Sequence, residues 1–193
     1  MIELFFDLET NGLIQKKAGN YKDLKSYPRI VQIAWILVKD GKECSVNDYI
    51  IKPEDFTVGD YTIHGITQEM AENHGFIYKS VFNKFYIDFN LADNIICHNI
   101  QFDLPVLQSE FFRRNVELNI DKKNLICTMM NSIDFCAIPN TNKYTKHQYK
   151  YPKLNELYEK LFKKQFEHQH DASADIRATR KCYNALKKKG IIN

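Results

Sequence analysis

The sequence lacks several features that would assign it to a secreted or membrane-bound class of protein. Its 193 residues contain five cysteines, an odd number, and no two of them form a CxxC pair. This usage favours reduced thiols over a disulfide framework. No basic segment followed by an apolar run stands at the N-terminus, and no apolar stretch is long enough to cross a bilayer. We therefore expect a cytoplasmic protein in a reducing compartment, without a membrane partner.

The chain also lacks internal repeats, low-complexity segments and any linker of domain length. Its hydrophobic fraction of 44% and charged fraction of 26% are ordinary for a soluble globular protein. A chain of this length can bury a full hydrophobic core. We predict a single domain over residues 1–193.

Positive charge is unevenly distributed along the chain. Residues 1–138 hold 14 Lys+Arg against 19 Asp+Glu, whereas residues 139–193 hold 13 against 5. A basic C-terminal part is compatible with a polyanionic partner. On charge alone, a solvated lysine-rich surface is the alternative.

The order of apolar segments predicts an α/β protein with a mixed sheet. Strands are predicted over residues 2–8, 30–38, 44–51, 94–97 and 125–128, the first apolar on both faces and therefore central. Helices are predicted near 69–71, after Ser80, over 102–114 and 154–162, and from residue 172. Thr67 and Asp171 are the expected N-caps of the first and last helix, and Pro105 is expected in the first turn of the third.

Two carboxylates lie on the first predicted strand. Asp7 and Glu9 are two residues apart, so both project from one face of the strand. Two carboxylates on one face repel each other unless a cation lies between them, and oxygen ligands suit Mg²⁺ or Mn²⁺. The alternative is an exposed edge strand, which the apolar neighbours of the two acids disfavour.

Two further stretches supply acids that could join this pair. Asp103 follows a strand end at His98–Asn99, where α/β sheets bind ligands, although an acid in a first helical turn is the simpler alternative. His170 precedes Asp175 by five residues at the start of the last helix, with His168 nearby. Together, four carboxylates and one histidine could hold two divalent metals and deprotonate a water.

These three stretches resemble the motifs of the DEDD exonuclease superfamily, in its DnaQ-like branch. The motifs D-x-E, N-x-x-x-D and H-x-x-x-x-D correspond to 7–9, 99–103 and 170–175. Asp171 stands where a sister subgroup has tyrosine, so the chain resembles the histidine type. The resemblance extends from about residue 1 to 186 and includes the stretch 63–67.

The resemblance implies a ribonuclease H-like fold, with a five-stranded mixed sheet whose second strand is antiparallel, flanked by helices. It implies metal-dependent 3′→5′ hydrolysis of nucleic acid to nucleoside monophosphates. Asp7, Glu9 and Asp175 would bind the first of two Mg²⁺ or Mn²⁺ ions and Asp7 would bridge to the second. Asp103 would hold the second ion largely through water, and His170 would be the general base.

Five further positions match residues that contact the terminal nucleotides in this family. For each of them a core or capping role is an open alternative. They are Thr10, Leu13, His64, Asn99 and Phe102, of which Leu13 would wedge beside the last base.

The segment 140–153 lacks helical or strand periodicity. It interleaves Lys143, Lys146, Lys150 and Lys153 with Tyr144, His147, Tyr149 and Tyr151. Lysines neutralise phosphates and tyrosines stack on bases without regard to sequence. We expect a mobile loop beside the active site that holds a single-stranded 3′ end through Lys143, Lys146, Tyr149 and Lys150. A solvated lysine-rich loop is the alternative.

Two departures from the family pattern bear on the biological role. The polar loop 15–29 is longer than the usual tight hairpin, and the chain ends soon after its last helix. A free-standing DNA exonuclease is therefore expected in preference to a proofreading subunit. An RNA-trimming exoribonuclease of the same chemistry and a non-catalytic nucleic-acid-binding module on the same fold are the alternatives.

Overall fold

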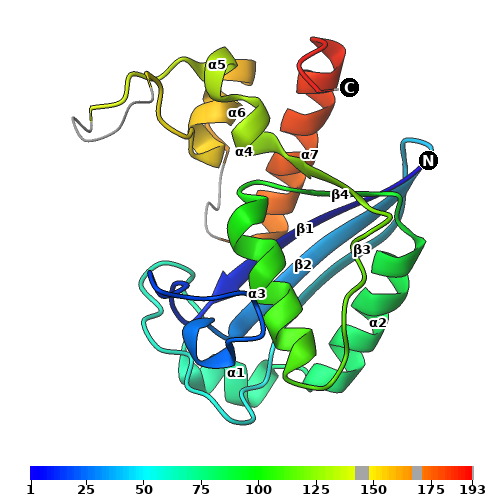
Figure 1. Cartoon of the computed structure of the whole chain (residues 1–193), viewed down its shortest axis with the longest axis vertical. Helices are drawn as coiled ribbons and strands as arrows, with labels where there is room; N and C mark the ends of the chain where they lie inside the picture. The colour runs from blue at the N-terminus through cyan, green and yellow to red at the C-terminus, as the bar shows by residue number, and fades with distance from the viewer. Residues whose placement is uncertain (142–147, 167–170, 193) are drawn as a thin grey trace.

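A five-stranded mixed sheet forms the centre of the computed structural model, which describes residues 1–141, 148–166 and 171–192 (Figure 1). The strands are β1 (Ile2–Thr10), β2 (Ile30–Lys39), β3 (Lys42–Ile50), β4 (Asn94–Cys97) and β5 (Asn124–Cys127). Their order is β3-β2-β1-β4-β5. β2 runs antiparallel to β1 and β3, whereas β1, β4 and β5 are parallel. The predicted sheet, with its second strand antiparallel, is confirmed.

Helices cover both faces of this sheet. They are α1 (Gln68–His74), α2 (Tyr78–Leu91), α3 (Ile100–Phe112), α4 (Thr128–Asn131), α5 (Ile133–Cys136), α6 (Leu154–Phe162) and α7 (Ala172–Lys188), with a short 3₁₀ helix at Leu24–Ser26. One core lies between the sheet and the α2–α3 layer, and the other lies under α6 and α7. Figure 1 shows α4, α5 and α6 gathered beyond the sheet, beside α7. No helix within the described ranges is long and apolar enough to span a membrane.

β1 is buried from both sides because its neighbouring side chains alternate between the two cores. Leu4, Phe6 and Leu8 belong to the core under α2 and α3. Phe5 belongs to the opposite core and packs edge-on against Tyr183 of α7, with ring centroids 5.3 Å apart. The odd-numbered positions of β1 therefore face α7.

Two helices begin earlier than predicted. α2 begins at Tyr78, so Ser80 lies inside its first turn and donates its hydroxyl to the Ile77 carbonyl at 2.9 Å instead of capping the helix. α3 begins before residue 102, which places Pro105 in its second turn. Asn99 makes the early start possible, because its left-handed backbone (φ 77°) turns the chain sharply from β4 into α3.

The two predicted side-chain caps are present. Thr67 Oγ1 accepts from the Met70 amide at 3.1 Å, and Asp171 Oδ1 accepts from the Ser173 amide at 2.8 Å. Each cap satisfies an amide that the first turn of its helix leaves without a partner. The short helices α4 and α5 were not predicted, because four residues are too few for a periodic pattern.

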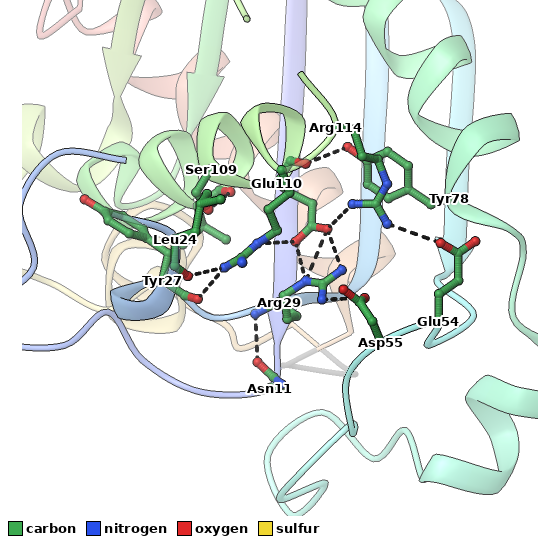
Figure 2. A network of polar contacts seen from close by, with 12 residues as sticks. Asn11, Leu24, Tyr27, Arg29, Glu54, Asp55, Tyr78, Ser109, Glu110 and Arg114 are labelled. Atoms are coloured by element: carbon green, nitrogen blue, oxygen red, sulfur yellow. Dashed lines mark hydrogen bonds and ion pairs between the residues drawn. The ribbon is translucent and has the colours of Figure 1, made fainter. Parts of the chain in front are cut away.

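A buried cluster of charges fixes the loop that follows β1 (Figure 2). Arg29 forms a two-pronged contact with Glu110 of α3, from Nε to Oε2 at 3.0 Å and from Nη2 to Oε1 at 3.0 Å, and also contacts Asp55 at 2.6 Å. Arg114 adds a second contact to Glu110 at 2.8 Å. The Arg29 amide donates to Asn11 Oδ1 at 2.8 Å, just beyond the end of β1. The long loop is thereby anchored to α3.

Candidate active site

Asp7 and Glu9 lie at the C-terminal end of β1. Both occupy odd-numbered positions, so their side chains point to the face that α7 covers, as the two-residue spacing predicted. Both are partly buried. The strand therefore presents two carboxylates to one helix.

Asp175 of α7 completes a three-carboxylate group with these two residues. The Asp171 cap sets where α7 begins, and Asp175 follows in the first turn. One carboxylate oxygen from each of Asp7, Glu9 and Asp175 lies within 4.8 Å of the other two. Oxygen atoms at this mutual separation, on three side chains, could hold one divalent cation between them.

Asp103 approaches the same region from α3. β4 runs parallel to β1, and the Asn99 turn places the first turn of α3 at the shared end of these two strands. Asp103 is buried, with 4% of its surface exposed. It stands outside the three-carboxylate group, which agrees with a separate role at a second ion.

Burial and mutual repulsion perturb all of these acids. Burial, and then the carboxylates of Asp103 and Asp175, raise the pKa of Asp7 well above its usual range. Burial and the neighbouring Asp175 raise the pKa of Glu9 to about 8. Burial also raises the pKa of Asp103, although the amides of Asp103 and Leu8 favour its ionised form. The site concentrates negative charge that nearby cations would relieve.

A cavity of about 650 Å³ opens over these acids. Leu13, Asn99 and Phe102, three of the five residues assigned to nucleotide contacts, line it together with Asp7, Glu9, Asp103 and Asp175. Leu13 is 82% exposed although it is apolar, so its side chain is available to a ligand. The volume falls within the range of about 300–1,000 Å³ typical of ligand sites.

The other two proposed nucleotide contacts are not among the residues that line this cavity. Thr10 Oγ1 donates to the Gly12 carbonyl at 2.7 Å and supports the turn after β1. His64 Nδ1 accepts from the Ile66 amide at 3.1 Å and holds its own loop. Both have the local structural role that was the alternative for these positions.

Parts of the predicted site lie outside the described residues. These are the proposed general base His170, its neighbour His168, and the loop lysines Lys143 and Lys146. Tyr149 and Lys150 are described but do not line the cavity. Tyr149 pairs with Pro139 in a β-bridge, and Lys150 forms an ion pair with Glu156, Nζ to Oε1, at 2.6 Å.

The structure adds residues that sequence reasoning did not assign to the site. His98, Met129, Tyr151, Lys153 and Phe166 also line the cavity. Tyr151 and Lys153 belong to the lysine–tyrosine alternation of segment 140–153, which was a usable signal, but the pattern does not say which of its members face the acids. Met129 and Phe166 carry no sequence signal.

Comparison with known proteins identifies the family. The sequence model of the family RNase_T, described as Exonuclease, matches residues 4–183. The chain therefore belongs to this exonuclease family, and the resemblance to DnaQ-like DEDD exonucleases is confirmed.

Individual relatives are more distant. The chain is 27% identical over 177 residues to a PolC-type DNA polymerase III of Latilactobacillus sakei, which covers 91% of this chain and 10% of the polymerase. Its structure is similar to that of E. coli Exonuclease I in complex with a dT13 oligonucleotide, with a TM-score of 0.73, 20% identity, and coverage of 96% of this chain and 41% of that one. It also resembles Exonuclease X in complex with 5′-overhanging duplex DNA, with a TM-score of 0.57, 21% identity, and coverage of 97% and 93%. The chain thus spans about a tenth of the PolC relative and two-fifths of Exonuclease I, and the structural likenesses show the shared ribonuclease H-like fold.

Proposed function

We propose that this chain is a metal-dependent 3′→5′ exonuclease that removes nucleoside monophosphates from single-stranded or frayed DNA ends. The observation that carries the proposal is the meeting of Asp7, Glu9 and Asp175, from two elements far apart in sequence, within 4.8 Å at one end of a cavity. Membership of the exonuclease family supports the reaction class. In this proposal residues 1–193 act as one exonuclease domain.

The donor set fits divalent cations. Carboxylate oxygens are hard ligands that suit Mg²⁺ or Mn²⁺ better than softer metals. The raised pKa values of Asp7 and Glu9 show that the folded chain holds these acids ionised only at a cost, and bound cations would remove it. Asp7, Glu9 and Asp175 would hold one ion, and Asp103 with Asp7 a second. Two such ions supply Lewis acidity that lowers the pKa of a bound water and stabilises charge on the scissile phosphate.

The remaining chemistry belongs to side chains of the protein. His170, five residues before Asp175, is the proposed general base that takes a proton from the attacking water. Leu13 and Phe102 offer apolar surface to the base of the terminal nucleotide, and Asn99 lies beside them in the cavity wall. The exposed Leu13 would insert next to that base and define the end of the strand.

The choice of DNA rests on the structural neighbours. E. coli Exonuclease I was solved with a dT13 oligonucleotide, and Exonuclease X with 5′-overhanging duplex DNA. Both ligands contain single-stranded DNA, whereas an exoribonuclease of the same chemistry would need contacts to the 2′-hydroxyl. A non-catalytic binding module is disfavoured because an acidic cavity repels phosphates unless cations fill it.

The test is digestion of single-stranded DNA, duplex DNA and RNA of one sequence, each labelled at its 3′ or 5′ end, with Mg²⁺ or Mn²⁺. A 5′-labelled strand should shorten progressively, and a 3′-labelled strand should release its label at once as a mononucleotide. EDTA and Asp7→Asn should both stop the reaction. Faster digestion of RNA would favour the exoribonuclease, and binding without digestion in either metal would overturn the proposed activity.

A further inference from the structure

The segment 151–153 forms the wall of the cavity beside the acidic group. Pro152 is buried, whereas its neighbours Tyr151 and Lys153 are exposed and line the cavity. Half of the Tyr151 surface is open. The alternation is that of an extended backbone whose central residue packs inward, so that the flanking side chains face the same open space.

A histidine holds this segment in place. His98 lies at the end of β4, and its Nε2 is 3.0 Å from the carbonyl oxygen of Pro152. A carbonyl can only accept, so Nε2 carries the proton. The Nδ1 of this neutral ring then accepts from Thr128 Oγ1 at 2.9 Å. Burial lowers the pKa of His98 to about 4, which keeps the ring neutral at ordinary pH.

Further contacts fix both ends of the segment. The Lys150 amide donates to the Ile138 carbonyl at 3.0 Å, and Lys150 Nζ contacts Glu156 Oε1 at 2.6 Å. The other oxygen of Glu156 accepts from the Lys153 amide at 2.8 Å. His98, Ile138 and Glu156 therefore hold this stretch from three different elements or loops. Rigid support of this kind lowers the entropic cost of binding a ligand.

The two exposed side chains suit a nucleotide. Tyr151 offers an aromatic face on which any base can stack, and Lys153 offers a cation for a phosphate. Within the described ranges Lys153 Nζ makes no ion pair, whereas nearby Lys150 is paired with Glu156. The residues assigned to the terminal nucleotide, Leu13 and Phe102, come from β1 and α3, and segment 151–153 is a separate part of the same cavity wall.

We infer that Tyr151 and Lys153 form a subsite for the nucleotide next to the terminal one, with His98 as the residue that positions them. The inference rests on the proposed exonuclease function. It replaces Tyr149 and Lys150 as strand contacts with the two residues that reach the cavity.

Two substrates separate this subsite from the reaction centre. A 5′-labelled dT oligonucleotide engages both positions. The p-nitrophenyl ester of thymidine 5′-monophosphate carries only the terminal nucleotide, and its hydrolysis breaks the same phosphorus–oxygen bond with p-nitrophenol as leaving group. The selectivity ratio is kcat/KM for the oligonucleotide divided by kcat/KM for the ester. It measures binding of the neighbouring nucleotide.

Replacement of either wall residue should lower this ratio. Tyr151→Ala should reduce it about tenfold, as expected when one base loses a stacking partner, whereas Tyr151→Phe should retain it. Lys153→Gln should lower the ratio and weaken its dependence on salt, whereas Lys153→Arg should retain both. Tyr61→Ala and Lys163→Gln, at exposed positions that do not line this cavity, are the matched controls.

His98 is tested by whether a donor at the same place restores selectivity. His98→Gln can still donate to the Pro152 carbonyl, and His98→Leu cannot. We expect the leucine variant to lose the selectivity ratio about as strongly as Tyr151→Ala, and the glutamine variant to recover most of it. If both variants lose activity on both substrates, circular dichroism and crosslinking of Tyr151 to a 5-iodouracil-containing strand, placed at the penultimate nucleotide, provide the second measurement.

The outcomes distinguish this subsite from the proposed function. A wild-type protein that hydrolyses neither substrate would overturn the exonuclease itself. A wild-type protein that hydrolyses both, with unchanged ratios in Tyr151→Ala and Lys153→Gln, would overturn only the subsite. Loss of the ratio in His98→Gln equal to that in His98→Leu would remove the positioning role of the Pro152 contact.

Discussion

Replacement of Glu9 by glutamine should stabilise the metal-free protein, although Glu9 is a proposed metal ligand. Burial and Asp175 raise the pKa of Glu9 from 4.5 to about 8. Between these two values the folded chain retains a proton that the unfolded chain has released. The free energy of unfolding therefore falls as pH rises from about 4.5 to about 8 and changes little beyond. Glutamine cannot ionise and escapes this loss.

The size of the effect follows from the two pKa values. Each pKa unit corresponds to about 1.36 kcal/mol, so the full difference for Glu9 sets an upper bound of about 5 kcal/mol. Glu9 is only partly buried, and solvent screening reduces this to about 2 kcal/mol. For a chain of this length, each kcal/mol shifts the melting temperature by about 2–4 °C. Metal-free Glu9→Gln should therefore melt about 4–8 °C above wild type at pH 8, and close to it at pH 5.

Thermal melts followed by circular dichroism measure this difference at several pH values, in EDTA and in Mn²⁺. The comparison of variant with wild type at each pH cancels the titration of all other groups. Glu159→Gln, at an exposed position on α6, is the control for loss of one negative charge. In Mn²⁺ the order should reverse, because only wild type keeps the full ligand set and gains stability from binding. Equal melting temperatures in EDTA at pH 8 would refute the electrostatic strain.

Three other results are expected. Asp7→Ala should lose several orders of magnitude in turnover with secondary structure retained, and a turnover that persists in EDTA would exclude the metal mechanism. His170→Ala should lower turnover by about 10²–10⁴-fold and His168→Ala should not, as rates across pH 5–8 on labelled single-stranded DNA would measure; the opposite pattern would assign the base to the other histidine. Glu110→Ala leaves buried arginines without their partner and should lower the free energy of unfolding in urea by about 3–5 kcal/mol, whereas the exposed Glu117→Ala should cost at most about 1 kcal/mol; similar losses for both would contradict the buried cluster in Figure 2.

The strands and most helices were predictable because their signals are local. β1 carries apolar residues on both faces and lies at the centre of the sheet between β2 and β4. Thr67 and Asp171 cap helices as their sequence positions predicted, because a cap depends on residues two or three positions away. The start of α3 was misplaced, since it depends on the left-handed backbone of Asn99.

The proposed ligand set shows the same division. The spacing of Asp7 and Glu9 determines that they share one face of a strand, whatever the rest of the chain does. That Asp175 joins them could be proposed only through the family resemblance, because it depends on how α7 packs across β1. Sequence separation says nothing of such a contact.

The sequence by itself determined the class of protein, the order of its elements and the acids that carry its proposed chemistry, because motif spacing and periodicity act within a few residues. Only the tertiary structure decided which members of the lysine–tyrosine segment reach those acids. Lys150 turns to Glu156, while Tyr151 and Lys153 line the cavity. The physical reason is the hydrogen bond from His98 to the Pro152 carbonyl, which joins residues 54 positions apart and sets the orientation of this wall.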